Sequence, residues 1–306
     1  MMIINQVVQG GGGSGPAHYI EKSVDANGKL VNGSSMIDLT GVTDLSAYVL
    51  YYAYYNNTNI TGALDLSSIK TLSGNACLDY GFNGCTGITS VDLSSLETIT
   101  GTYALDNAFS GCSGITNIDI SLLTTANASS CMQSTFSGCS SITSLIFYSL
   151  TEIKAQSVFN KAFQRCYNLT YLAFPSLTPN SFGATYTNQL NLLLSNVTGC
   201  TVHFPSNIQS TIGSWTSVTS GFGGTSTTVL FDLPATNTLT GADTETYTRN
   251  PKYDTATALA WKVGAYGTTN FTPAYYTSGT TDPSVADTIY SDDACTTSVT
   301  TITAIA

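Results

Sequence analysis

Four cysteines with regular spacing are the first residues in this sequence that could do chemistry. Each follows a phenylalanine by three residues, and the set recurs every 27 residues: Cys85, Cys112, Cys139 and Cys166. Eight cysteines in one chain could form disulfides or bind zinc. The sequence has no C-x-x-C pair and no histidine beside the cysteines, which argues against zinc. We therefore expect buried free thiols, with disulfides as the alternative.

Four aspartates share the same spacing: Asp38, Asp65, Asp92 and Asp119. Each stands between two apolar residues, so on a strand its side chain points away from the core. Stacked carboxylates repel one another unless something offsets the charge. Hydrogen bonds from neighbouring hydroxyl residues could do so, and these are Thr40, Ser67, Ser94 and Ser121. The alternative is that the aspartates bind a cation or the hydroxyl groups of a ligand.

Farther along the chain the equivalent outward positions become apolar or aromatic: Ile146, Tyr148, Tyr171 and Ala173. Tyrosine offers a large contact area at a low cost in conformational entropy. An aromatic patch beside an acidic, hydroxyl-rich strip suits a glycan or a peptide. We expect the binding residues to be Asp38, Asp65, Asp92, Asp119, Tyr148 and Tyr171.

Catalysis finds no support in the sequence. The only histidines are His18 and His203, and neither has the neighbours of a catalytic triad. The stretch Ser67-Ser68-Ile69-Lys70 matches S-x-x-K, but it occupies a repeat position where another unit has Ser94-Ser95-Leu96-Glu97. No phosphate-binding glycine loop is present. We expect a protein that is not an enzyme, with no catalytic residues, no cofactor and no metal.

A 27-residue repeat must position all of these side chains. Its further columns are apolar, and they begin with Phe82, Phe109, Phe136 and Phe163, then Ile88, Ile115, Ile142 and Leu169, then Val91, Ile118, Leu145 and Leu172. Weaker copies precede them, with Tyr54 in the phenylalanine column, and a degenerate copy follows with Leu193 there. Alternation around Val91 and Leu93 predicts a short strand in each unit. The Cys column suits side chains that satisfy backbone groups inside turns.

One such unit cannot close a core alone, but stacked units bury a continuous one. The repeats therefore predict a β-rich solenoid over residues 36–208, with a parallel concave sheet and short helical or irregular convex segments. The motif Ala108-Phe109-Ser110-Gly111-Cys112 through Ile115, Ile118 and Ile120 resembles the cysteine-containing leucine-rich repeats of the BspA-like type. The resemblance implies a cell-surface or secreted protein that binds host molecules.

Shorter segments flank the repeats. The apolar tag with Ile3, Ile4, Val7 and Val8 is followed by a glycine-rich linker, and we expect this tag to add as a strand to another sheet and anchor the protein in an assembly. This layout is similar to that of phage tail or head-fibre proteins, and residues 281–290 resemble small C-terminal β modules of phage and bacterial surface proteins. The expected domains are a tag and linker (1–16), an N-terminal cap (17–35), the solenoid (36–208), a C-terminal cap (209–234) and a small antiparallel β module (235–306).

Composition narrows the function further. Charged residues make up 9% of the chain, with a net charge of −10. So few basic side chains argue against nucleic-acid binding, and no apolar run is long enough to cross a membrane. The first residues lack the features of a secretory signal. We therefore expect a virion surface protein, assembled in the host cytoplasm as a homo-oligomer, that contacts other virion proteins through its tag and a host-surface glycan or protein through its repeats. The alternatives are a bacterial cell-surface adhesin and a structural spacer without a ligand.

Overall fold

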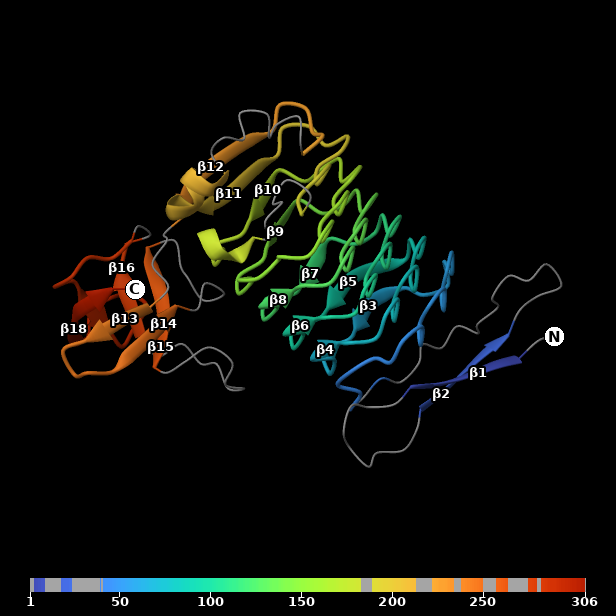
Figure 1. Cartoon of the computed structure of the whole chain (residues 1–306), viewed down its shortest axis with the longest axis horizontal. Helices are drawn as coiled ribbons and strands as arrows, with labels where there is room; N and C mark the ends of the chain where they lie inside the picture. The colour runs from blue at the N-terminus through green and yellow to red at the C-terminus, as the bar shows by residue number, and fades with distance from the viewer. Residues whose placement is uncertain are drawn as a thin grey trace.

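The repeats stack as successive coils that together form a parallel β-solenoid (Figure 1). The computed structural model describes residues 3–8, 18–23, 39, 41–182, 189–212, 222–233, 238–249, 257–263, 275–279 and 282–305. Each coil has a wall that carries one short strand, a second wall with a two-residue strand in three of the coils, and a third wall made of turns. The predicted fold class is confirmed.

The first wall, here called the sheet wall, contains two parallel sheets where one was expected. Its strands are β3 (Gly62–Asp65), β5 (Ile88–Asp92), β7 (Asn117–Asp119), β9 (Ser144–Ile146), β10 (Tyr171–Ala173), β11 (Thr201–Pro205) and β12 (Thr228–Leu233). They pair in the orders β3-β5-β7 and β9-β10-β11-β12, and no ladder joins β7 to β9. The register follows the repeat, with Val91 opposite Ile118 and Asp92 opposite Asp119.

The second wall is a narrower parallel sheet of three two-residue strands. They are β4 (Thr71–Leu72), β6 (Thr98–Ile99) and β8 (Thr125–Ala126). Helical structure in the described residues is limited to η1 (Pro179–Ser181), η3 (Ser206–Ile208) and α1 (Gln209–Ile212), all after the regular repeats. The convex segments of the repeats are therefore irregular, which was one of the two expected forms.

The third wall, the turn wall, comprises residues 46–57 and their equivalents in later coils. Its amide groups alternate between two partners. The Tyr48 N–H donates to the Asn75 carbonyl in the next coil at 3.0 Å, whereas the Val49 N–H donates to Ser46 three residues back at 3.3 Å. The alternation continues through Asn57 and recurs in later coils. Successive turns thus satisfy the backbone groups that a helix or a strand would otherwise pair.

These turns require positive φ at every fourth residue, which the sequence supplies mostly without glycine. Tyr52, Asn107 and Lys161 have φ between 52° and 56°. Such a left-handed conformation is uncommon for non-glycine residues and carries a steric cost. Hydrogen bonding between the coils holds the turns in this conformation. The last position in each run is glycine in three successive coils, at Gly84, Gly111 and Gly138.

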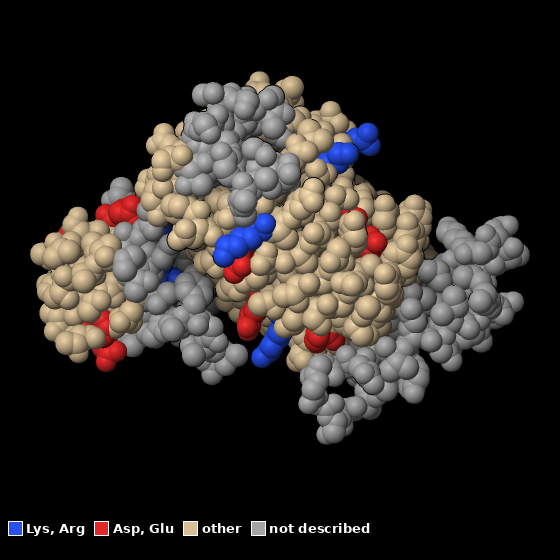
Figure 2. Space-filling model, in the orientation of Figure 1, with Lys and Arg blue, Asp and Glu red and all other residues tan. Residues whose placement is uncertain are grey.

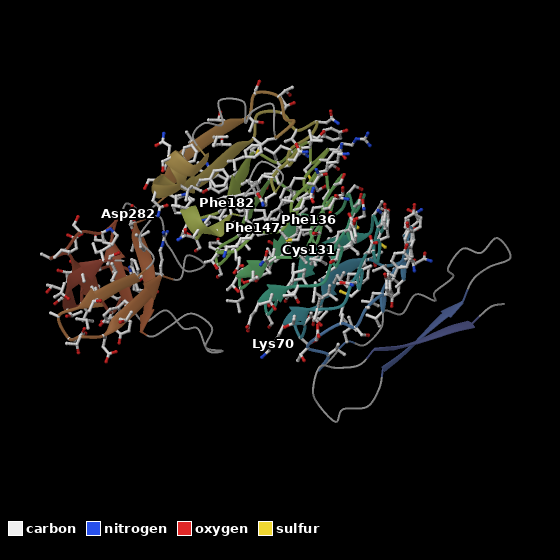
Figure 3. The ribbon with its side chains drawn as sticks, viewed as in Figure 1. Lys70, Cys131, Phe136, Phe147, Phe182 and Asp282 are labelled. Atoms are coloured by element: carbon white, nitrogen blue, oxygen red, sulfur yellow. The ribbon has the colours of Figure 1, made fainter. Side chains whose placement is uncertain are left out.

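A column of aromatic rings forms the centre of the core, as expected. Phe82, Phe109, Phe136 and Phe163 stack with ring centroids 5.7 Å apart at each step. Tyr54 extends the stack at 5.1 Å from Phe82, which confirms its place in the phenylalanine column. Figure 3 shows Phe136, Cys131 and Phe147 in the interior of the coils. The inward residues of the sheet wall pack against this column, and Val91 and Leu93 are almost fully buried.

The cysteine column has the backbone role expected for it. Each thiol donates a hydrogen bond to a carbonyl in the preceding coil: Cys85 to Tyr54 at 3.0 Å, Cys112 to Phe82 at 3.0 Å, Cys139 to Phe109 at 3.2 Å and Cys166 to Phe136 at 3.1 Å. All eight cysteines are free, and only Cys295 is accessible. Burial raises the pKa of Cys112 to about 12 and that of Cys85 to about 11. The expectation of buried free thiols is confirmed.

We predict that iodoacetamide at pH 8 labels the native protein at Cys295 alone. A thiolate is the reacting species, so buried thiols of raised pKa react at least about tenfold more slowly. Peptide mass spectrometry would locate the label, and addition of urea should expose all eight sites. A Cys295→Ser variant should take up no label without urea. Rapid labelling of Cys112 in the native protein would contradict the prediction.

The repeat stacking continues beyond residue 208. β12 pairs in parallel with β11, and Phe231 stacks on Phe204 at 6.0 Å. The segment expected to act as a C-terminal cap therefore includes one further strand of the same sheet. At the other end, β1 (Ile3–Val8) pairs antiparallel with β2 (His18–Ser23). The strand predicted for the apolar tag is present, but its partner is a segment of its own chain rather than another sheet.

The C-terminal strands form a six-stranded antiparallel barrel, closed by the pairing of β13 with β18. The strands are β13 (Thr238–Gly241), β14 (Thr246–Arg249), β15 (Ala258–Val263), β16 (Tyr275–Ser278), β17 (Thr288–Tyr290) and β18 (Ser298–Ile305). Trp261 fills its core, and its indole N–H donates to Thr277 Oγ1 at 2.9 Å. The small antiparallel β module is thus confirmed.

Candidate functional site

The predicted aspartate column lies on the outer surface of the sheet wall. Asp65, Asp92 and Asp119 end β3, β5 and β7 in register, and Asp38 lies outside the described residues. Each carboxylate accepts the backbone N–H two residues on: Ser67 at 2.9 Å, Ser94 at 2.9 Å and Ser121 at 3.1 Å. Hydrogen bonds from the Ser67 hydroxyl and N–H lower the pKa of Asp65. Hydrogen bonds from the neighbouring serine residues are thus present, but only Ser67 uses its hydroxyl, and at Asp92 and Asp119 the donor is the backbone N–H.

The predicted aromatic positions differ from one another in the structure. Tyr171 begins β10, and its ring stacks on the His203 ring at a centroid distance of 4.4 Å. His203 Nδ1 lies 2.9 Å from an oxygen of Asp232. Tyr171 is therefore engaged with groups of its own chain. Ala173 is in register with Ile146 and His203 on the neighbouring strands but is only 1% exposed, so it offers no accessible surface to a ligand.

A groove of about 310 Å³ joins two of the predicted residues, Asp119 and Tyr148. Its lining comes from three successive stretches of the chain: Asn117 to Ser121, Ser144 to Ile146, and Tyr148. Asp65, Asp92 and Tyr171 do not line it. Of the six predicted binding residues, the structure thus brings two together in one concavity.

The groove lies where the sheet wall is interrupted. Elsewhere on this wall an amide just after one strand bonds to the next strand, as Leu93 does to the Asp119 carbonyl at 2.8 Å and Phe147 to the Ala173 carbonyl at 2.9 Å. Between β7 and β9 no ladder forms. The aspartate column also ends at this step, because Ile146 occupies the next outward position. The interruption opens a space with a carboxylate on one side and apolar groups on the other.

Ser121 supplies a second polar group to the groove. Ser121 is 4% exposed, and its hydroxyl has no hydrogen-bond partner among the described residues. A buried hydroxyl without a partner is costly, roughly 1–3 kcal/mol. A ligand group that bonds to this hydroxyl would recover that free energy. The Ser121 hydroxyl is therefore an unsatisfied polar group in a residue that lines the groove.

The chemistry available in the groove is recognition. Asp119 can accept hydrogen bonds from ligand hydroxyls, Ser121 can donate or accept one, and Ile146 with the Tyr148 ring offers an apolar surface. No group of three or more His, Cys, Asp or Glu side chains in the described parts of the chain is arranged to hold a metal ion. On the face shown in Figure 2, lysine, arginine, aspartate and glutamate side chains are few and scattered over a surface of other residues.

The sequence reasoning missed a second surface feature, a tyrosine patch on the turn wall. We define it as Tyr48, Tyr51, Tyr52, Tyr55 and Tyr80. The signal was present in the run Ala47-Tyr48-Val49-Leu50-Tyr51-Tyr52-Ala53-Tyr54-Tyr55, whose tyrosine content is far above that of the other repeats. Only Tyr54 of this run was assigned a position, because it alone falls in a repeat column.

Fold and surface together define a class: a helix-poor solenoid of leucine-rich-type repeats that presents polar and aromatic groups on its outer walls. Residues 47–192 match the family described as BspA type leucine rich repeat region, in six copies. The repeats of this chain are therefore similar to BspA-type leucine-rich repeats, as the sequence resemblance implied, over somewhat less than half of the chain. The match lies outside the N-terminal hairpin and the C-terminal barrel.

One solved structure is similar over much of the chain, a leucine rich cell surface protein from Faecalibacterium prausnitzii A2-165. The identity is 14% and the TM-score 0.34, over 79% of this chain and 60% of that one. The chain thus spans less than two thirds of that protein, and the likeness is too low to bear on function. A search of curated proteins found no match. No helix in the described residues is long and apolar enough to cross a membrane.

Proposed function

We propose that this protein is a non-enzymatic adhesin of a bacterial cell surface, and that its repeats bind a glycan in the groove between β7 and β9. The observation that carries the proposal is the meeting of Asp119, Tyr148 and the unpartnered Ser121 hydroxyl in one concavity. A sugar has hydroxyl groups that can bond to Asp119 and Ser121, and an apolar C–H face that can pack on the Tyr148 ring.

The repeat type supports the surface role. The BspA-type repeat family matches this chain in six copies. The resemblance seen in the sequence implies a cell-surface protein that binds host molecules. The virion role rested on the flanking segments and on the first residues of the chain. The family match covers none of these segments, so it lends the virion role no support.

A glycan array followed by calorimetry tests the proposal, with Asp119→Asn and Tyr148→Leu as variants. We expect each to weaken binding of the best array ligand by about tenfold or more, because a hydrogen bond to a charged group contributes about 1.5–3 kcal/mol. The matched control is Asp92→Asn, one coil away, whose carboxylate accepts the same kind of backbone hydrogen bond outside the groove. That control should change affinity less than about twofold.

Ser121→Ala separates binding from folding. Because the Ser121 hydroxyl has no partner in the free protein, its removal should leave the melting temperature unchanged or raise it while binding weakens. Equal losses of affinity in Asp119→Asn and Asp92→Asn would count against the groove. Failure of every glycan to bind would refute the proposed ligand class.

A further inference from the structure

The tyrosine patch is a continuous surface of rings in mutual contact. Centroid distances are 5.8 Å for Tyr48–Tyr51, 4.7 Å for Tyr51–Tyr52, 5.1 Å for Tyr52–Tyr55 and 4.6 Å for the stacked pair Tyr52–Tyr80. Tyr48 and Tyr51 are 52% and 40% exposed. Exposed aromatic surface of this extent is characteristic of interaction sites.

Packing of the core does not require these rings. Along the turn wall two inward residues alternate with two outward ones, so Val49, Leu50, Ala53 and Tyr54 are buried while the patch residues lie outside. From residue 103 onward the same outward positions hold Tyr103 and otherwise aspartate, asparagine, glutamine, serine or lysine. Polar residues therefore serve the fold at these positions, and the tyrosines need another explanation.

Two carboxylates continue the outward column that begins at Tyr51. Asp79 lies in the next coil and Asp106 in the one after, as the bonds from the Tyr52 N–H to the Asp79 carbonyl and from the Tyr80 N–H to the Asp106 carbonyl place them. Burial is the main cause that raises the pKa of Tyr52 to about 12, and the neighbouring Tyr80, Tyr51 and Asp79 contribute in that order. The carboxylate of Asp79 is thus an electrostatic neighbour of the stacked rings.

The Asp79 carboxylate is incompletely satisfied. Its Oδ1 atom is buried and accepts no hydrogen bond from any described group. Asp106, in contrast, accepts hydrogen bonds from Asn107 at 2.7 Å and from Gln133 at 3.4 Å. Neither carboxylate forms an ion pair with a described lysine or arginine. The half-buried Asp79 carboxylate therefore has an oxygen that no described group satisfies and a charge that no described cation pairs with.

We propose that the tyrosine patch with Asp79 is a docking site for an arginine side chain of a partner protein. A guanidinium group stacks on tyrosine faces, where the ring quadrupole attracts it, and pairs at the same time with a carboxylate. Charge complementarity fixes the choice of occupant, because the patch joins aromatic faces to an unpaired acid in a chain of net charge −10. Arginine and tyrosine are also the residues that dominate binding energy at protein interfaces. This site is separate from the groove, which lies on the sheet wall.

Fluorescence anisotropy with a labelled hexa-arginine peptide, at 0.15 M salt and with the full chain, tests the inference. We expect saturable binding that Asp79→Asn weakens about tenfold and Tyr51→Leu weakens about as much. A hexa-citrulline peptide, which has the same shape without the charge, should not bind. Asp65→Asn removes the same charge from another wall and is the matched control, with less than a twofold effect expected.

Two further comparisons control for unfolding and for binding at the groove. Asp79→Asn removes a half-buried charge that has no ion-pair partner among the described residues. Its melting temperature should therefore not fall, and a loss of binding then cannot reflect unfolding. Asp119→Asn in the groove should leave peptide binding unchanged, which keeps this site distinguishable from the proposed glycan site. The inference is overturned if hexa-arginine fails to bind, if hexa-citrulline binds equally, or if Asp65→Asn weakens binding as much as Asp79→Asn.

Discussion

Replacement of Phe109 by alanine is expected to lower the free energy of unfolding by about 3–5 kcal/mol. Phe109 is fully buried and stacks on both sides, on Phe82 and on Phe136, at 5.7 Å. Truncation removes apolar surface from the core and leaves a cavity inside a column whose spacing is fixed by hydrogen bonds between coils. Those bonds prevent the neighbouring coils from collapsing into the space, which places the expected cost at the upper part of the usual range.

Urea denaturation followed by circular dichroism measures this loss. Phe109→Leu is the graded variant and should cost less, because leucine fills part of the space. Tyr103→Ala, on an exposed residue of the same coil, should change the free energy of unfolding by less than about 0.5 kcal/mol. A cost below about 1 kcal/mol for Phe109→Ala would mean that the aromatic column does not hold the coils together.

The aromatic and cysteine columns could be predicted because they repeat. A residue that faces the core meets the same neighbours in every coil, so the same type returns at every 27th position, as Phe82 and Phe109 do. Outward residues have no such constraint. Position 51 is tyrosine, and its equivalents in later coils are Asp79, Asp106 and Gln133, so no periodicity marks the tyrosine patch. The conformation of the turn wall was hidden for a related reason, because tyrosine and lysine occupy left-handed positions where glycine would be the expected sign.

The groove was only half predictable. The sequence indicated an acidic column that ends at Asp119 and aromatic positions beyond it. It did not indicate that the sheet itself is interrupted there, since the pairing of β7 with β9 depends on the backbone rather than on a pattern of residue types. Ser121 was expected to donate its hydroxyl to an aspartate. The backbone N–H makes that bond instead, which leaves the hydroxyl without a partner among the described residues.

The stability of the protein should fall as the pH rises from about 4 to about 7, and Asp106 is the main expected cause. Burial first, and then the neighbouring charge of Asp79, raises the pKa of Asp106 from an ordinary 3.8 to about 7. In this range the folded state holds a proton that the unfolded chain has already lost, so a higher pH favours unfolding. Each unit of difference between the folded and unfolded pKa corresponds to about 1.4 kcal/mol, so the expected loss of stability is on the order of 4 kcal/mol. Asp79, whose pKa burial raises to about 6, acts in the same direction.

An Asp106→Asn variant removes the titration and can keep the shorter hydrogen bond, which Asn107 donates at 2.7 Å, because the amide retains one acceptor oxygen. The longer bond from Gln133 to the other carboxylate oxygen is lost. We expect it to be more stable than the original chain at pH 8, by on the order of 2–4 kcal/mol, and about equally stable at pH 4.5. Thermal unfolding at both pH values measures the difference. Asp65→Asn provides a control of opposite sign, because hydrogen bonds lower the pKa of Asp65 and its loss should reduce stability at pH 8. An unchanged slope of stability against pH in Asp106→Asn would contradict this prediction, because it would mean that the carboxylate ionises in the folded protein at little cost. The turn wall around Asp106 would then have to be far better solvated than the 7% exposure of this residue indicates.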